Sequence, residues 1–398
     1  MLYIAIQLIL IFCCFIIKDE DIKEIFYKVF FIFLTLFLIF RYGQGSDYFN
    51  YNIIFNNIDS YDKVFQSGDP GFNMLILLMK SIGIGYIQFN AIIAIISMLL
   101  VYIFFNKFCK NKLLALTVFY PIYYMVFWYS AIRQGLAMSI FMGILIPLLY
   151  KKKYISYIIM TVVTASLHLS AIFLLLLLVV KFIPLYNKKI FGGILISTIV
   201  YQIFNLQNVL IKILPEHFQY RISTYLSDGI SYSALLNRLL IFLIVIYLFY
   251  KSNEEKKKDN LFLLNIYIFG LFLYLVLMTS PAIASRLNFY IKVVDCVLIA
   301  NLAPINIKSK LEIGQMAIIS LILTILLIKN ISALLYQGRY YSYVNVIRYP
   351  YVTILNKDSI HSYRQASEDL RYKGLFPTKY QWPLVIDEEL EKMIDLND

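Results

Sequence analysis

The chain is poor in the residues that hold metals, form disulfides or make a soluble surface. Charged residues are 15% of its 398 positions, and it has only three histidines and four cysteines. No Cys-x-x-Cys motif or histidine cluster is present, so we expect neither a metal nor another cofactor. No loop predicted to lie outside the membrane carries a cysteine pair, which argues against structural disulfides. Because a basic aromatic groove and nucleic-acid motifs are also missing, we expect no nucleic-acid partner.

Apolar residues dominate the composition of the chain. They make up 61% of the chain, and the mean hydropathy is +0.73, far above that of a soluble domain. We therefore predict an all-α polytopic integral membrane protein with about 12 transmembrane helices. The predicted spans are 2–17, 26–41, 86–106, 113–129, 134–150, 154–167, 169–183, 190–206, 235–250, 261–279, 285–303 and 315–335. We divide the chain into a membrane domain, residues 1–335, and an extracytoplasmic C-terminal tail, residues 336–398.

Lysines and arginines separate between alternate loops. Six short basic loops contain only lysine, whereas all nine arginines fall in the loops between them or in the tail. Lysine is typical of the cytoplasmic side, while the planar guanidinium of arginine suits phosphate and carboxylate. The pattern predicts an inner (plasma) membrane protein with its N-terminus outside and an outer face that handles an anion. Alternatively, lysine is simply the usual cation of this chain, and the arginines fell outside by chance.

One apolar stretch is too long for a single helix, but two membrane-crossing helices there would conflict with the charge pattern of the next loop. Residues 72–106 are interrupted at Gly83-Ile84-Gly85, and two crossings would place the lysines of 107–112 outside. A single crossing keeps the positive residues inside. We therefore predict that 72–82 is a re-entrant or interfacial helix at the outer surface.

The first outer loop holds a candidate base. Arg41 ends a helix, and Gly43 and Gly45 allow a tight turn before Asp47. A carboxylate over a membrane-embedded pocket could accept a proton from a sugar hydroxyl. The alternative is an ordinary turn in which Asp47 caps a helix. Asp69, before Pro70, either faces a substrate or simply marks a turn and a helix start, and its position before Pro70-Gly71 favours the second interpretation.

Two arginines lie at the predicted outer N-termini of helices. Arg133 and Arg286 each stand where a helix N-terminus already favours anions, although an interfacial arginine also reaches toward lipid headgroups. His168 lies between apolar segments, where a histidine is costly unless it faces a cavity or a partner. It is either a functional base or donor, or a packing histidine bonded to Ser170. Weaker candidates are Arg221, Arg238 and His217, which bracket the 207–234 loop. Lys292 and Asp295 follow Arg286 in the same predicted helix, where each is expected to pair with a buried group.

These residues together resemble a known family. Their order resembles that of the EpsG family of polysaccharide polymerases, which are similar in role to Wzy O-antigen polymerases. The resemblance covers about residues 1–335 and rests on order and topology. One departure is Asp69, where glutamate is expected before Pro-Gly, which leaves its role open. The motifs that carry the resemblance are Arg41-x3-Gly45-x-Asp47-Tyr48-x2-Tyr51, Pro70-Gly71-Phe72, Arg133-Gln134 with Ala137, His168-x-Ser170, and Arg286 with Tyr290.

The resemblance implies a membrane glycosyltransferase. Such an enzyme moves a growing glycan from undecaprenyl diphosphate to the next lipid-linked repeat on the outer face of the inner membrane. Catalytic candidates are then Asp47 and, second, His168, and a GT-C-like architecture is one option for the fold. A chain-length regulator is one expected partner of the tail. Arg41, Arg133 and Arg286 are implied to bind the diphosphate, and Tyr48, Tyr51, Trp128, Gln134 and Tyr290 to bind sugar.

Three other functions compete with the polymerase. A lipid-linked oligosaccharide flippase would need a basic cavity across the bilayer and usually two related halves, and no internal repeat is apparent. A membrane O-acyltransferase would use a histidine with an acyl donor, typically from the cytoplasmic side, whereas His168 maps outside. A non-catalytic scaffold would tolerate single substitutions at Arg133 or His168.

Overall fold

The computed structural model is helical throughout the part of the chain that it describes. Its only β-type pairing among these residues is a single bridge between Arg41 and Thr353. This confirms an α-helical fold. Arg221, His217 and most of the tail lie outside the described residues. Those described are 2–45, 47–65, 68–180, 182–204, 229–304, 310–337 and 351–355.

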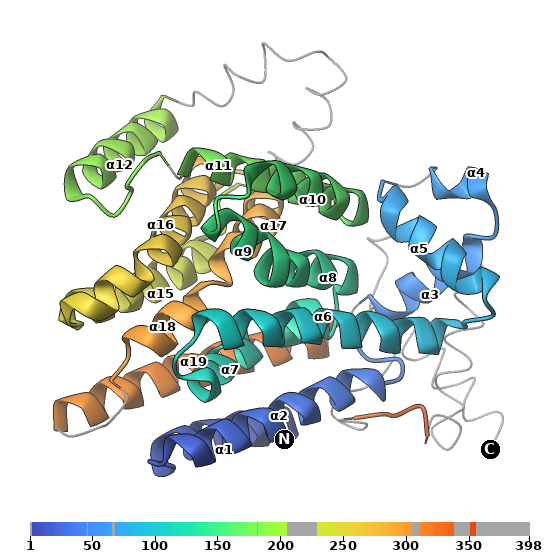
Figure 1. The fold of residues 1–398 in the computed structure, drawn as a ribbon, viewed down its shortest axis with the longest axis horizontal. Coiled ribbons are helices and arrows are strands. Elements are labelled where there is room, and N and C mark those ends of the chain that lie inside the picture. The colour runs from blue at the N-terminus through green and yellow to red at the C-terminus, as the bar shows by residue number, and fades with distance from the viewer. Residues whose placement is uncertain are drawn as a thin grey trace.

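Long helices run roughly parallel to the longest axis of the molecule (Figure 1). Several begin at a side chain that accepts hydrogen bonds from the first free N–H groups, such as Asp19 at α2 and Asn253 at α16. In chain order, the helices of the first half are α1 (Leu2–Ile16), α2 (Glu20–Ile39), α3 (Tyr48–Asn57), α4 (Tyr61–Val64), α5 (Pro70–Ser81), α6 (Tyr86–Phe108), α7 (Lys112–Phe119), η1 (Tyr120–Trp128), α8 (Ile132–Ile140), η2 (Phe141–Leu145) and α9 (Ile146–Tyr150). Those of the second half are α10 (Tyr154–Leu167), η3 (Leu169–Leu176), α11 (Leu177–Val180), α12 (Lys188–Ile203), α15 (Tyr232–Lys251), α16 (Glu254–Leu277), α17 (Pro281–Lys292), α18 (Asp295–Leu302) and α19 (Lys310–Gln337).

The described helices include nine apolar ones that bear on the membrane prediction. Four are long and apolar enough to cross a bilayer, namely 86–108, 132–150, 232–251 and 254–277. Five shorter apolar helices cover 2–16, 112–128, 154–167, 169–180 and 316–330. These lengths support a multi-pass protein, since about 20 residues complete a crossing. The total of about 12 spans stays a prediction.

Buried tyrosines tie the centre of the bundle together. The π-helix η1 carries Tyr120, Tyr123 and Tyr124, all fully buried. Tyr120 donates to the carbonyl of Tyr3 in α1 (3.1 Å), and Tyr124 donates to that of Leu34 in α2 (2.7 Å). Where water is excluded, each such bond satisfies a hydroxyl that would otherwise be costly to bury. The sequence therefore uses tyrosine, rather than only aliphatic residues, to join neighbouring helices.

Three short helices, α3, α4 and α5, gather at one end of the bundle (Figure 1). The Lys80 ammonium holds α5 there by donating to the carbonyls of Phe55, Asn56 and Ile58 around the end of α3. Gly83, with a φ of 79°, then turns the chain into α6. The predicted helix over 72–82 is thus a separate element, confirmed as helical. Its interfacial position stays a prediction.

Two predicted boundaries have different outcomes. The break expected near Leu167-His168 is confirmed, because α10 ends at Leu167 and His168 is extended, with a φ of −155°. The span predicted as one piece over 285–303 is wrong in detail, since the helix breaks between Lys292 and Asp295. Those two side chains form a buried ion pair across the break, at 2.7 Å.

Candidate functional site

An ion pair between Arg133 and Asp69 forms the centre of the candidate site. Nη1 of Arg133, in the first turn of α8, lies 2.7 Å from Oδ2 of Asp69, which precedes α5. The two side chains are 22% and 15% exposed, so solvent or a ligand reaches the pair. Of the five N–H donors of a guanidinium, this contact uses one. The arginine is therefore held in place while most of its donors stay available for an anion.

Asp69 also joins the ion pair to the break between α10 and η3. Its second oxygen, Oδ1, accepts a hydrogen bond from the Leu169 N–H at 3.0 Å. Close packing makes this reach possible, because a Cβ on Gly71 would collide with Ser166. Asp69 makes no side-chain hydrogen bond to the N-terminus of α5, so its carboxylate is not a helix cap. The simpler sequence interpretation of Asp69, a turn and helix start, misses this contact.

His168 lies beside the residue that bonds Asp69. Its Nδ1 is 2.7 Å from the Ser170 hydroxyl and 3.1 Å from the Tyr290 hydroxyl of α17. The predicted contact with Ser170 is therefore present, and Tyr290 adds a second partner from another helix. Within the described residues, Nε2 of His168 has no hydrogen-bond partner, so it is available to a substrate.

Burial and nearby cations hold His168 neutral. Desolvation is the largest influence and lowers the pKa of His168 from its ordinary 6.5. The Asp69 carboxylate acts in the opposite direction, whereas Arg133 and Arg286 lower the pKa further. A neutral imidazole near pH 7 has a lone pair and is the form that serves as a general base.

Arg286 and Gln134 connect the site to α17. The Arg286 side chain is exposed in the middle of α17, close enough to influence His168 electrostatically. Its backbone carbonyl accepts a hydrogen bond from the Gln134 amide, Nε2, at 3.0 Å. Gln134 is 6% exposed and its amide is used in this contact, so the structure gives it a positioning role between α8 and α17.

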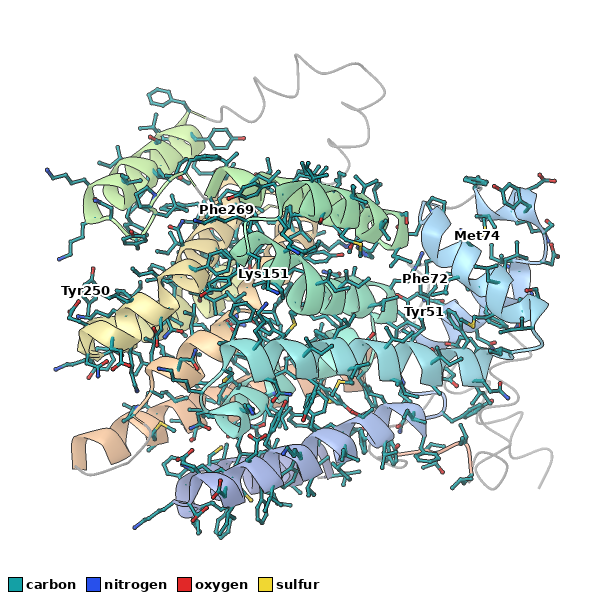
Figure 2. The ribbon with its side chains drawn as sticks, in the orientation of Figure 1. Tyr51, Phe72, Met74, Lys151, Tyr250 and Phe269 are labelled. Atoms are coloured by element: carbon teal, nitrogen blue, oxygen red, sulfur yellow. The ribbon has the colours of Figure 1, made fainter. Side chains whose placement is uncertain are left out.

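Aromatic rings surround the guanidinium of Arg133. Its Cζ lies 5.1 Å from the centre of the Tyr51 ring and 5.6 Å from that of Phe72. Tyr51 and Phe72 lie together at one end of the molecule, far from Tyr250 at the other (Figure 2). The pKa of Tyr51 is raised to about 12, first by burial and then by the Asp47 carboxylate. Tyr51 is therefore a neutral phenol.

Asp47 directly precedes α3 on the border of this cluster. It occupies the N-cap position of α3, as the alternative interpretation expected, but its side chain makes no capping hydrogen bond to that helix. Its electrostatic influence on Tyr51 places the carboxylate near the ring that covers Arg133. The structure thus brings Asp47 to the margin of the site, and its role as a base stays a prediction.

A second predicted anion-binding arginine, Arg41, is buried among aromatic rings. Arg41 is 5% exposed, and its Nε and Nη1 have no hydrogen-bond partner in the part of the chain described. The guanidinium lies 5.0 Å from the ring centre of Tyr129 and 5.7 Å from that of Tyr48. Gly45, with a φ of 101°, permits this arrangement, since a Cβ there would collide with the Tyr129 carbonyl oxygen. Unsatisfied buried donors are costly, and an anion would satisfy them.

The predicted sugar-stacking residues are mostly covered. Trp128 is 3% exposed and packs edge-on against Phe119, with ring centres 4.7 Å apart. Tyr48, Tyr51 and Tyr290 are also buried. The contact of these four side chains with sugar stays a prediction.

Sequence reasoning placed most of the cluster but omitted its carboxylate. Asp69 was not among the predicted site residues, although it contacts both Arg133 and the Leu169 N–H. A usable signal was present in the sequence. Asp69 is the last acidic residue before a long stretch that has none, so it is one of few possible partners for Arg133, which lies in that stretch. No group of three metal-ligating side chains occurs among the described residues.

Comparison with known proteins identifies one family. The model of the EpsG family matches residues 24–349, which is most of the chain. The match includes Asp69, Arg133, His168 and Tyr290. Neither the curated proteins nor the solved structures contain a match to the chain.

Proposed function

The chain belongs to the EpsG family, whose members are Wzy-like polymerases, and on this premise we propose that it polymerises a surface polysaccharide from lipid-linked repeats. The donor would be a growing glycan on undecaprenyl diphosphate, and the acceptor would be the next repeat on its own carrier. The observation that carries the proposal is the cluster of Arg133, Asp69, His168 and Tyr290. Four segments distant in sequence contribute to it at the outer end.

The reaction places distinct demands on the site. An acceptor hydroxyl oxygen attacks the anomeric carbon of the donor, and the bond from that carbon to the diphosphate oxygen breaks. The bonding electrons leave on the diphosphate, and the hydroxyl proton passes to a base. A site for this reaction therefore needs cations at the leaving group and a base at the acceptor.

Arginines are the proposed partners of the diphosphate. Arg133 has spare donors and a fixed position, and Arg41 has buried donors without partners among the described residues. Arg286 is exposed and, like Arg133, influences His168 electrostatically. Planar guanidinium groups bind phosphate oxygens in pairs, which suits a leaving diphosphate.

His168 and Asp47 are the proposed bases. With hydrogen on Nδ1 donated to the Ser170 hydroxyl, the Nε2 lone pair of His168 faces away from its protein partners and can accept the proton. Asp47 is at the margin of the cluster, and a carboxylate in the first outer loop could serve the same step. Tyr290 would then hold the imidazole in position.

A complementation experiment tests the polymerase. A deletion strain would receive the wild type, Arg133→Lys, His168→Gln, or the control Lys63→Gln, which alters an exposed pair with Asp59 at the same end. Membrane levels would be measured by immunoblot and surface glycan length on a gel. We expect wild type and control to restore long polymer, and the two site variants to leave single repeats on their carrier.

Two results would contradict the proposal. Long polymer in the deletion strain would show that another protein polymerises the glycan. Single repeats that never reach the outer face would instead assign this protein to lipid-linked oligosaccharide transport.

A further inference from the structure

A cavity of about 220 Å³ lies beside the lysine run 151–153, and none of the residues that line it belongs to the candidate site. It is formed where α9, α11 and α16 meet. Its volume is near the lower end of ligand pockets, which begin at about 300 Å³. The walls are apolar and include Leu149, Leu177, Val180, Phe262 and Ile266.

The mouth of the cavity has the composition of a membrane boundary. Tyr150 and Tyr186, which line it, are 54% and 43% exposed. Tyrosines with an apolar ring and a polar tip are enriched at the level of lipid headgroups. Lys152 also lines the cavity and is exposed. An apolar interior beneath aromatic rings and one cation matches a lipid molecule with a charged head.

The backbone holds Lys152 in an unusual conformation. Its φ is 57°, and it is the only non-glycine residue with positive φ among those described. The Lys152 N–H bonds the Leu149 carbonyl at 3.1 Å, and the Lys153 N–H bonds the Leu148 carbonyl at 2.9 Å. This is the pattern of a helix end at which glycine is strongly preferred in the position of Lys152. Backbone strain of this kind points to a use for the side chain.

The charge around this mouth is unbalanced. The chain has no acidic residue between Asp69 and Glu216. Elsewhere on the lysine side, Lys110 pairs with Asp259 and Lys112 with Glu24, whereas Lys152 has no ion pair among the described residues. A site that keeps a cation without a protein partner suits an anionic ligand. Basic pockets between helices on this side of a membrane bind anionic headgroups.

The wall beside the mouth is fixed in place. Asn265 of α16 donates to the carbonyls of Val180 and Ile183 at 2.8 and 2.9 Å, and its Oδ1 accepts from the Leu185 N–H at 2.6 Å. These bonds tie the end of α11 and the turn after it to α16. The cavity is therefore built between anchored elements.

From these observations we propose that the cavity binds an anionic glycerophospholipid of the leaflet on the lysine side. The headgroup phosphate lies at Lys152, and an acyl chain lies along the apolar walls. This inference is independent of the polymerase proposal, since none of the residues that line the cavity belongs to the candidate site.

Native mass spectrometry of the full chain in detergent tests the site. Phosphatidylglycerol and phosphatidylcholine with the same acyl chains would be titrated into wild type, Lys152→Gly and the control Lys151→Gln, which changes a neighbour that does not line the cavity. Lys152→Gly places glycine where the backbone favours it, so the fold should be kept. We expect its affinity for phosphatidylglycerol to fall about fivefold, with the control unchanged.

A second variant and a competitor separate the possible occupants. Val180→Phe should fill the cavity and weaken phosphatidylglycerol without changing the lysines. Glycerol 3-phosphate should not displace the lipid. Equal losses in Lys152→Gly and Lys151→Gln would overturn the proposal in favour of general attraction to the surface. Displacement by glycerol 3-phosphate, or equal binding of phosphatidylcholine, would also overturn it.

Discussion

Two ion pairs of this protein have nearly the same length but opposite surroundings. Arg133 and Asp69 are 2.7 Å apart with side chains 22% and 15% exposed, whereas Lys292 and Asp295 are 2.7 Å apart with side chains 3% and 0% exposed. The first pair joins segments 64 residues apart, and the second lies within one helix break. Length alone therefore does not distinguish a pair that solvent or a ligand can reach from one that is fully enclosed.

The two pairs differ in the share of the cation's hydrogen-bond donors that have protein partners. The Lys292 ammonium contacts both Asp295 and the Tyr123 hydroxyl, which itself donates to Asp295 at 2.8 Å. The result is a closed network that braces α17 against η1. Arg133 keeps donors available, and it lies near His168 and exposed Arg286. The closed pair stabilises the bundle, while the open pair suits a ligand.

The largest expected effect comes from opening the closed pair. Lys292→Met leaves the Asp295 charge buried without its cation, and breaking such a pair costs about 3–5 kcal/mol of stability. Lys292→Met with Asp295→Leu should recover most of the loss because no charge remains. Thermal unfolding of the purified protein in detergent measures both. If Lys292→Met alone were as stable as wild type, the structural role of the pair would be refuted. Any loss of polymer length in this variant should match its loss of folded protein.

The open pair should behave in the opposite way. Arg133→Gln removes a cation from the developing charge of the diphosphate, so we expect polymerisation to fall about 100- to 1000-fold. Because the pair is partly exposed, stability should change by only about 1 kcal/mol. Consumption of lipid-linked repeats in membrane vesicles measures the rate. Adding Asp69→Asn should not restore it, whereas rescue by the double variant would make this pair structural, like the first.

Hydrogen bonds to His168 should have a smaller effect. Tyr290→Phe removes the hydroxyl that lies 3.1 Å from Nδ1 of His168 and keeps the buried aromatic ring on α17. A typical hydrogen bond contributes about 1 kcal/mol, so a rate loss of about fivefold is expected. The same vesicle assay applies. Tyr274→Phe, which alters another buried tyrosine away from His168, is the matched control, and an equal loss there would show that the effect is not local.

The sequence predicted which residues lie close together better than it predicted the contacts that they make. Arg133 and His168 were expected at the outer face from their positions at helix ends, and Tyr290 from the resemblance, and the structure brings them together. The break at His168 was also visible, because a polar residue interrupts an apolar run. Helix ends and charge placement follow from local sequence and from the membrane boundary.

Contacts between distant segments were not predictable in the same way. The bonds of Asp69 to Arg133 and to the Leu169 N–H depend on how α5 packs against α10, where Gly71 admits Ser166. The break within 285–303 was missed because Lys292 and Asp295 fit a continuous helix by spacing alone. Burial of Trp128 was likewise hidden, since an interfacial tryptophan and a core tryptophan have the same neighbours in sequence.

The subtlest prediction concerns the titration of His168. Its pKa is lowered by burial and by Arg133 and Arg286, so its midpoint should lie below 6.5. Removing the Arg286 charge removes one of the lowering influences, and Arg286→Gln should therefore move the midpoint upward. Asp69→Asn removes the raising influence and should move it downward. Because protonation blocks reaction, the fraction of neutral imidazole can be read from the rate of diethyl pyrocarbonate modification against pH.

The readout requires that His168 be the only histidine of the chain. His217→Gln and His361→Gln provide that background, in which Lys63→Gln, far from the imidazole network, serves as the charge control. Shifts of opposite sign in the Arg286 and Asp69 variants would establish that the open pair and its neighbours set the charge of the proposed base. A control that moves as far as either variant would mean that the shifts are not local. Unchanged midpoints in both variants would mean that burial alone governs His168. The outer cluster would then resemble the closed pair, in which the environment fixes the charges and no ligand is needed to complete them.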